Sequence, residues 1–352
     1  MRPSRDRIIR AGLGTLALTG LHRLFKPVFG GMGAIFMLHH VRPAREGAFQ
    51  PNQLLEITPQ FLRATLAYLR AEGIEIVTLD EMRRRLNARD TGPRFACLTF
   101  DDGYRDNRDV ALPILREFDA PATVYVASDF AEGRGRLWWV ALERLIAAND
   151  RITVTIDGGE QRFETTTVEG KRAAFAHLNG WVVAQADDRA AVRAVGEWCA
   201  RHGIASDGIG SELCMSWDEL RAFAADPLIT IGAHTVTHCN LAKQDEATAR
   251  TEMVDSRARI AAALGRDVAH FAYPYGYRSA AGPREFALAE TLGFATAVTT
   301  RPGMVFTAHA GHLTALPRIS LNGNYQEPRF LPPLASGAAT ALWNGFRRLD
   351  VG

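Results

Sequence analysis

The chain has 352 residues, enough for one large α/β domain or two smaller ones. Hydrophobic residues make up 47% and charged residues 23%, which is typical of a soluble globular protein and argues against disorder. The 41 basic and 39 acidic residues leave a formal net charge of +2, which argues against a dedicated nucleic-acid-binding protein.

The N-terminal segment, residues 1–30, combines a basic start with an apolar middle, as a secretory signal would. Charged residues interrupt the apolar run, no A-x-A cleavage site follows, and the run is too short to span a bilayer. We interpret the segment as an amphipathic helix packed on the domain, with Ile9, Leu13, Leu16 and Leu24 on one face. A signal peptide for export and a helix lying on a membrane surface are the alternatives. The four scattered cysteines form no CxxC pair, which favours a reducing, cytoplasmic compartment.

Residues 31–134 alternate short apolar segments with helical patterns, which predicts βα units and a parallel sheet. Thr58 followed by Pro59 is typical of an N-cap and the first helical residue, so a helix is expected from there to about residue 71. A basic helix around residues 81–86 and another ending near residue 118 follow. The expected strands of this part are residues 33–38, 74–77, 95–100 and 122–126.

The pattern changes at residues 135–212, which we interpret as an inserted α/β subdomain. It contains a predicted hairpin turning on Asp157-Gly158-Gly159 and two helices, over about 168–184 and 188–202. Trp138 and Trp139 lie at helical spacing and are interpreted as core residues. Alternation resumes in residues 213–325, and residues 326–352 are expected to form a tail with one short helix. The expected later strands are residues 228–233, 269–274, 294–299 and 316–321.

Polar side chains follow the predicted strands at the point where each ends. His39 follows the first strand, Asp101 and Asp102 the third, and His234 and Tyr275 follow two later ones. About eight strands are enough to close a barrel, and catalytic residues of α/β barrels gather at the C-terminal strand ends. The sequence therefore predicts a parallel α/β barrel with these groups on one face.

The two histidines of HTVTH, His234 and His238, are four residues apart, which on a helical turn would place both imidazoles on one side. One carboxylate from LTFDDGY would complete a set of three ligands with a position open, as in catalytic zinc sites. The second carboxylate could then take a proton from water acidified by the cation. The alternative is that the aspartates are solvated or cap a helix and the histidines lie on the surface.

Three motifs, LTFDDGY (98–104), IGAHTVTHCNL (231–241) and FAYPYG (271–276), resemble in this order the first three motifs of the polysaccharide deacetylases, carbohydrate esterase family four. The resemblance covers about residues 33–130 and 213–322. It implies a deformed parallel (β/α) barrel and a divalent metal, Zn²⁺ or another first-row transition metal. It also implies hydrolysis of N-acetyl groups on an oligo- or polysaccharide, with N-acetylglucosamine as the expected sugar.

The resemblance also implies a role for each matching residue. Asp101 would be the general base, and Asp102, His234 and His238 would hold the metal. The backbone N–H of Tyr275 would stabilise the oxyanion of the tetrahedral intermediate.

Two positions depart from the family pattern. Many members have an arginine two residues before the proline of the third motif, where this chain has Ala272. Arg318 of LPRIS could supply that guanidinium, with a surface ion pair as the alternative. The late Leu-x-His motif, whose histidine protonates the leaving amine, is missing. We prefer His39 as its replacement, because it follows the first strand where the family has an aromatic–His pair. The other candidates are His40, His309 and His312.

The sequence thus predicts a metal-dependent deacetylase acting on a carbohydrate. The alternatives are an amidohydrolase of the same fold acting on a non-sugar amide, and a catalytically silent, metal-holding carbohydrate-binding protein. A nucleic-acid partner is not expected, and membrane contact through the N-terminal helix stays open. Neither the oligomeric state nor the role of the insertion follows from the sequence.

Overall fold

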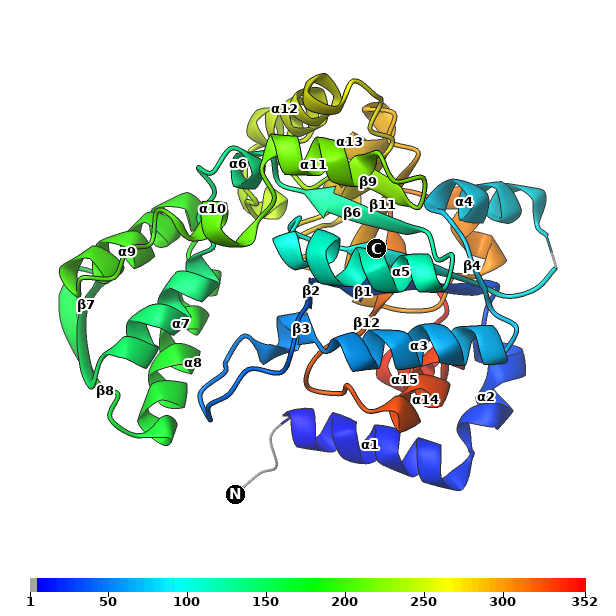
Figure 1. Cartoon of the computed structure of the whole chain (residues 1–352), viewed down its shortest axis with the longest axis horizontal. Helices are drawn as coiled ribbons and strands as arrows, with labels where there is room; N and C mark the ends of the chain where they lie inside the picture. Colours follow the sequence, from blue (N-terminus) through cyan, green and yellow to red (C-terminus); the bar gives the residue numbers. More distant parts are fainter. Residues whose placement is uncertain (1–4, 91) are drawn as a thin grey trace.

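The computed structural model describes residues 5–90 and 92–352; residues 1–4, the start of the predicted N-terminal helix, lie outside this part. Parallel strands close into a barrel in the order β1-β12-β11-β10-β9-β6-β5, and β5 pairs back to β1. Figure 1 shows the helices arranged around this ring. The strands of the ring are β1 (Gly33–Leu38), β5 (Phe95–Phe100), β6 (Ala122–Val126), β9 (Ile229–Ala233), β10 (His270–Ala272), β11 (Thr296–Pro302) and β12 (Leu316–Ser320).

The barrel closes with seven strands because one of the eight predicted strands lies outside the ring. This strand, β4 (Glu75–Ile76), pairs with Phe95 and Ala96 at the start of β5. The same edge of β5 pairs further along with β6, from Leu98 onwards, while β1 occupies the whole opposite edge. Because two strands share one edge, β4 ends after two residues and the barrel is deformed.

Helices pack their apolar faces against the strands. In α3 (Pro59–Ala71), the side chain of Thr58 caps the first turn by accepting a hydrogen bond from the Phe61 N–H, as expected from the sequence. Leu62, Leu66 and Leu69 of this helix are buried against the barrel. The helices of the barrel are α3 (Pro59–Ala71), α4 (Leu79–Ala88), α5 (Leu112–Glu117), α6 (Ser128–Ala131), α11 (Trp217–Ala224), α12 (Glu246–Leu264) and α13 (Pro283–Thr291). Two short strands, β2 (His40–Val41) and β3 (Glu56–Ile57), pair with each other beside the barrel.

The elements between α6 and α11 form a second hydrophobic core on one side of the barrel, at the left of Figure 1. This core includes Leu142, Ile146, Val154, Leu178 and Val195. The hairpin predicted at residues 152–163 forms, with Asp157 in the left-handed region at its turn. The elements are α7 (Trp138–Ala148), β7 (Arg151–Ile156), β8 (Gly159–Glu164), α8 (Val168–Ala184), α9 (Asp188–Arg201) and α10 (Ile209–Leu213).

Two helices, rather than the single one expected, form at the N-terminal end. Gly20, with φ of 70°, separates α1 (Arg5–Thr19) from α2 (His22–Phe29). Leu13 and Leu16 are buried as expected, whereas the break turns Leu24 outwards, and its side chain is 72% exposed.

The C-terminal tail packs on these two helices. It contains α14 (Leu331–Ala335) and α15 (Ala338–Trp343), one helix more than the sequence predicted. None of the helices in the described part of the chain is both long and apolar enough to cross a membrane.

Candidate active site

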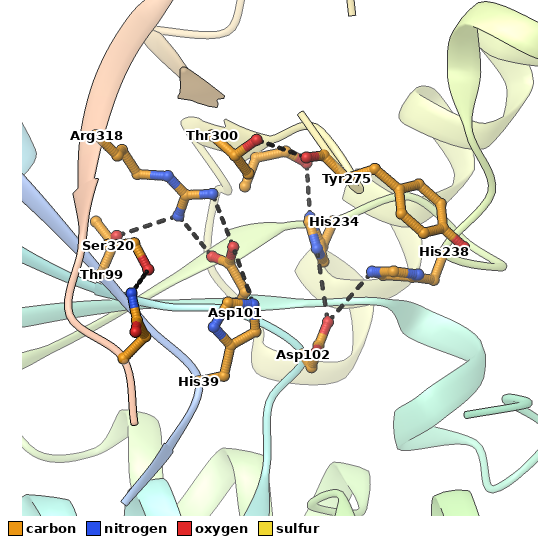
Figure 2. A network of polar contacts seen from close by, with 12 residues as sticks. His39, Thr99, Asp101, Asp102, His234, His238, Tyr275, Thr300, Arg318 and Ser320 are labelled. Atoms are coloured by element: carbon orange, nitrogen blue, oxygen red, sulfur yellow. Dashed lines mark hydrogen bonds and ion pairs between the residues drawn. The ribbon is translucent and has the colours of Figure 1, made fainter. Parts of the chain in front are cut away.

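The polar residues singled out in the sequence meet at one end of the barrel (Figure 2). Asp101 directly follows β5, His234 follows β9, and His39 follows β1. Tyr275 lies just beyond β10, and Arg318 lies within β12 and points toward Asp101. Because the strands are parallel, their C-terminal ends bring these distant segments together.

Asp102, His234 and His238 form a cluster suited to a metal ion. One ligand atom from each lies within 4.8 Å of the others. Oδ1 of Asp102 is 3.6 Å from Nε2 of His234 and 3.3 Å from Nε2 of His238. This buried oxygen has no hydrogen-bond partner among the described residues. A buried, unsatisfied carboxylate oxygen facing two imidazole nitrogens is costly without a cation, and two nitrogens with one oxygen suit zinc.

The imidazole of His234 is held in the orientation that a metal ligand needs. Its Nδ1 lies 2.7 Å from the carbonyl oxygen of Ala272, to which it donates, so the lone pair of Nε2 faces Asp102. Burial lowers the pKa of His234 to about 4, although the charges of Asp101 and Asp102 act in the opposite direction. The ring is therefore neutral at pH 7, the form that binds metals.

The HTVTH segment is an irregular turn, which corrects the helical turn expected from the spacing of its histidines. Thr235 and His238 have φ of 64° and 59°, in the left-handed region. Glu252 of α12, which the sequence analysis did not single out, fixes this backbone. Its carboxylate accepts hydrogen bonds from the N–H groups of Val236 and Thr237, both at 2.9 Å. These hydrogen bonds replace a helical ladder, so both imidazoles still reach Asp102.

Arg318 forms a buried two-point ion pair with Asp101. Its Nη1 and Nη2 donate to the two carboxylate oxygens at 2.7 Å each, and its Nε donates to the carbonyl of Thr299. The arginine is 1% exposed, so the alternative of a surface ion pair does not hold. Burial acts to raise the pKa of Asp101, but the charge and hydrogen bonds of Arg318 outweigh it, and the pKa lies below its ordinary value.

Of the four histidines considered as proton donors, His39 lies nearest to the aspartates. Its Nε2 is 4.0 Å from Oδ2 of Asp101. His40 instead contacts Asp106 at 2.6 Å and stacks on the ring of Tyr104. His309 lies in its own turn, where its Nδ1 contacts the backbone of Phe306. No contact of His309 or His312 with the aspartates occurs in the part of the chain that the structure describes.

The N–H of Tyr275 donates no hydrogen bond to any described residue, so it is available to a ligand. Tyr275 has φ of 62°, and Asp102 has φ of 73°. Together with Thr235 and His238, they make up four of the eight non-glycine residues with positive φ in the described chain. Strained backbone of this kind concentrates where function fixes the geometry.

Aromatic side chains form a wall beside His238. The ring of Trp139 lies 5.2 Å and that of Phe130 5.6 Å from the imidazole. Nε1 of Trp138 donates to the hydroxyl of Tyr275 at 3.1 Å. Both tryptophans are buried, as expected for core residues, but they also contact the site. Helical spacing alone could not reveal this second contact.

A cleft of about 210 Å³ lies beside the candidate site. His238, Trp138 and Tyr275 line it, together with residues at the start of α9. The carboxylate of Asp188 accepts hydrogen bonds from the Asn240 N–H and the Gln244 amide. The carboxylate of Asp129 accepts hydrogen bonds from Arg134 and Arg259. Four arginines also line the cleft, Arg134, Arg136, Arg189 and Arg193, and of these Arg134 and Arg189 are ion-paired with carboxylates.

The model of a family described as polysaccharide deacetylase matches residues 88–154 and 150–295, which is more than half of the chain. No curated protein matches this chain. The Streptococcus pyogenes deacetylase PplD in complex with acetate has a TM-score of 0.56 and 19% identity, over 86% of this chain and 97% of that one. IcaB from Ammonifex degensii has a TM-score of 0.52 and 19% identity, over 87% of this chain and 97% of that one. A de-N-acetylase from Aggregatibacter actinomycetemcomitans has a TM-score of 0.53 and 14% identity, over 82% of this chain and 95% of that one. At these identities the likeness shows a shared fold, so the predicted deformed (β/α) barrel is confirmed.

Proposed function

The chain belongs to the polysaccharide deacetylase family, and on this basis we propose that it removes N-acetyl groups from amino sugars of an oligo- or polysaccharide, with N-acetylglucosamine as the expected sugar. One observation carries the proposal. A carboxylate kept ionised by Arg318, that of Asp101, lies beside the Asp102–His234–His238 cluster. A general base and a three-ligand metal site are the two parts with which metal-dependent hydrolases cleave an unactivated amide.

The ligand cluster fits a divalent cation, and we propose Zn²⁺. When bound, the cation would acidify a water molecule and polarise the amide carbonyl. The protein would contribute one negative charge from Asp102 and two neutral imidazoles. The carbonyl of Ala272 holds one imidazole in place, and the turn fixed by Glu252 holds the other.

Asp101 would accept the proton of the attacking water as the new C–O bond forms at the amide carbon. The N–H of Tyr275 would donate to the oxygen on which negative charge develops, a contribution of about 3 kcal/mol in comparable sites. The C–N bond then breaks, and the nitrogen leaves with one additional proton as a free amine. The products are acetate and the deacetylated sugar.

His39 is the residue that we propose for delivering the proton to the leaving nitrogen. Burial lowers its pKa, although the charges of Asp101 and Asp102 act in the opposite direction. The imidazole is thus neutral at pH 7 and needs a proton before it can act as an acid. Asp101 carries one after the water is deprotonated, and its Oδ2 is 4.0 Å from Nε2 of His39. A proton relay between the two would supply the acid.

Acetate release from N-acetylglucosamine oligomers tests this function. The protein would be assayed as purified, after chelation, and after addition of zinc to the chelated sample. We expect activity that chelation removes and zinc restores. His234→Ala should lose both bound metal and activity, whereas His312→Ala, outside the cluster, should retain both.

Two results would favour the alternatives. Release of a carboxylic acid other than acetate from a non-sugar amide would indicate an amidohydrolase of another substrate class. Binding of the oligomers without turnover, unchanged in Asp101→Asn, would indicate a carbohydrate-binding protein.

A further inference from the structure

Exposed apolar side chains concentrate on one surface of the protein, away from the candidate active site. In the described chain, twelve large hydrophobic side chains are exposed, and eight of them lie within residues 8–28 and 342–346. Single exposed apolar residues are normal, but a concentration of this kind marks an interaction surface. Seven of them define what we call the docking face: Leu18, Leu21, Leu24, Val28, Leu342, Trp343 and Phe346.

The three helices that carry the docking face, α1, α2 and α15, pack together (Figure 1). Leu21, Leu24 and Val28 recur at the spacing of one helical face, and α2 contains no buried residue. Behind this row, Phe25 and Phe29 contact Phe346 at ring distances of 6.4 Å and 5.8 Å. The outward side of α2 thus joins the segment that follows α15.

Basic residues accompany the docking face. Arg347 and Arg348 directly follow Phe346, and Arg23 and Lys26 lie on the polar side of α2, opposite Leu24, whereas residues 21–30 and 342–349 contain no acidic residue. Lys26 has one carboxylate partner, Glu72, at 2.9 Å. A helix with an apolar side and a basic polar side, next to further arginines, matches a membrane whose lipids carry negative headgroups.

We propose that this face docks on the surface of an anionic lipid bilayer. Leu24 and its neighbours would enter the boundary between headgroups and acyl chains, and the basic side chains would contact lipid phosphates. The protein would be attached peripherally, with the barrel outside the bilayer. A second copy of the chain and a soluble partner protein are the competing occupants, and basic residues on both faces of a symmetric contact would repel each other.

Co-sedimentation of the full chain with vesicles tests the proposal. Vesicles of phosphatidylcholine alone would be compared with vesicles that also contain phosphatidylglycerol, at low and high salt. We expect binding to the anionic vesicles, weakened by salt, and about a tenfold loss in Leu24→Glu. Val254→Glu on α12 is the matched control, because Val254 is also exposed, at 40%, but lies outside the docking face. Equal thermal melting of both variants would show that they fold.

Three results would overturn the proposal. The first is no binding to anionic vesicles at low salt. The second is equal loss of binding in Leu24→Glu and Val254→Glu. The third is a concentration-dependent dimer, seen without vesicles and lost in Leu24→Glu, which would assign the face to a second copy. Acetate release from soluble oligomers should be the same in Leu24→Glu and the wild type, so failure here is separable from failure of the proposed function.

Discussion

Arg318 and Asp101 lie 217 residues apart in the chain and form a two-point ion pair, in which Nη1 is 2.7 Å from Oδ1 and Nη2 is 2.7 Å from Oδ2. The resemblance led us to expect an arginine at position 272, where this chain has the buried Ala272. The guanidinium that pairs with Asp101 instead comes from Arg318 of β12.

Arg318→Lys should keep the fold but lower kcat by about 100-fold, because an ammonium cannot hold both carboxylate oxygens. Asp101 acts as an ionised base, so activity is lost as the pH falls through its pKa. Weaker pairing raises this pKa, and the acid limb of the pH–rate profile should move to higher pH. The profile is the decisive measurement, since a purely structural role would lower activity and leave the limb in place.

Asp101→Asn should retain the bound metal and lose turnover by about 10²- to 10⁴-fold, because the amide cannot accept the proton. Metal content and acetate release would be measured on the same sample.

His39→Gln should lower turnover less than Asp101→Asn does and should act on the step in which the amine leaves. Substrates with a more acidic leaving amine should therefore be affected less by His39→Gln, and an equal loss for all substrates would contradict the proposed role of His39.

Glu252→Gln should reduce metal affinity by about 10- to 100-fold, as loss of an outer-shell contact does in metal sites. Glutamine has one carboxamide oxygen, so it cannot accept from both backbone N–H groups and also from the Thr237 hydroxyl, as the carboxylate does. Titration of the apoprotein with zinc measures the effect. Arg189→Gln, which removes an ion pair to the same carboxylate at 2.6 Å, should have a smaller effect of the same sign.

His309 should make the stability of the fold depend on pH. Burial lowers its pKa to about 4 from the ordinary 6.5, although contact with the Phe306 backbone acts in the opposite direction. The unfolded chain therefore binds the proton more readily, and stability present above pH 6.5 is lost as the pH falls from 6.5 toward 4, by roughly 3 kcal/mol at most. Urea unfolding of the wild type and His309→Gln across this range tests it. The difference in their free energies of unfolding should shrink with falling pH, and a constant difference would contradict the prediction.

The sequence was informative where a local pattern determines structure. The apolar segments predicted most strands, and the three motifs predicted which residues meet at one end of the barrel. Features that depend on distant contacts could not be predicted in this way. The exclusion of β4 depends on what else pairs with β5, and the backbone of HTVTH depends on Glu252 in another helix. Likewise, LPRIS did not reveal whether Arg318 is buried.

Four arginines and two aspartates line the cleft, so its lining has a formal charge of +2, equal to that of the whole chain and concentrated on a small surface. A field of this kind attracts acidic chains over about 30 Å at an ionic strength of about 0.01 M, but over only about 10 Å at about 0.1 M, and it leaves neutral chains unaffected. Acetylated glycans that carry uronate or phosphate groups would thus be captured faster than uncharged ones in dilute buffer. Added salt would remove the advantage, so a preference between two glycans would depend on the medium as well as on the sugar.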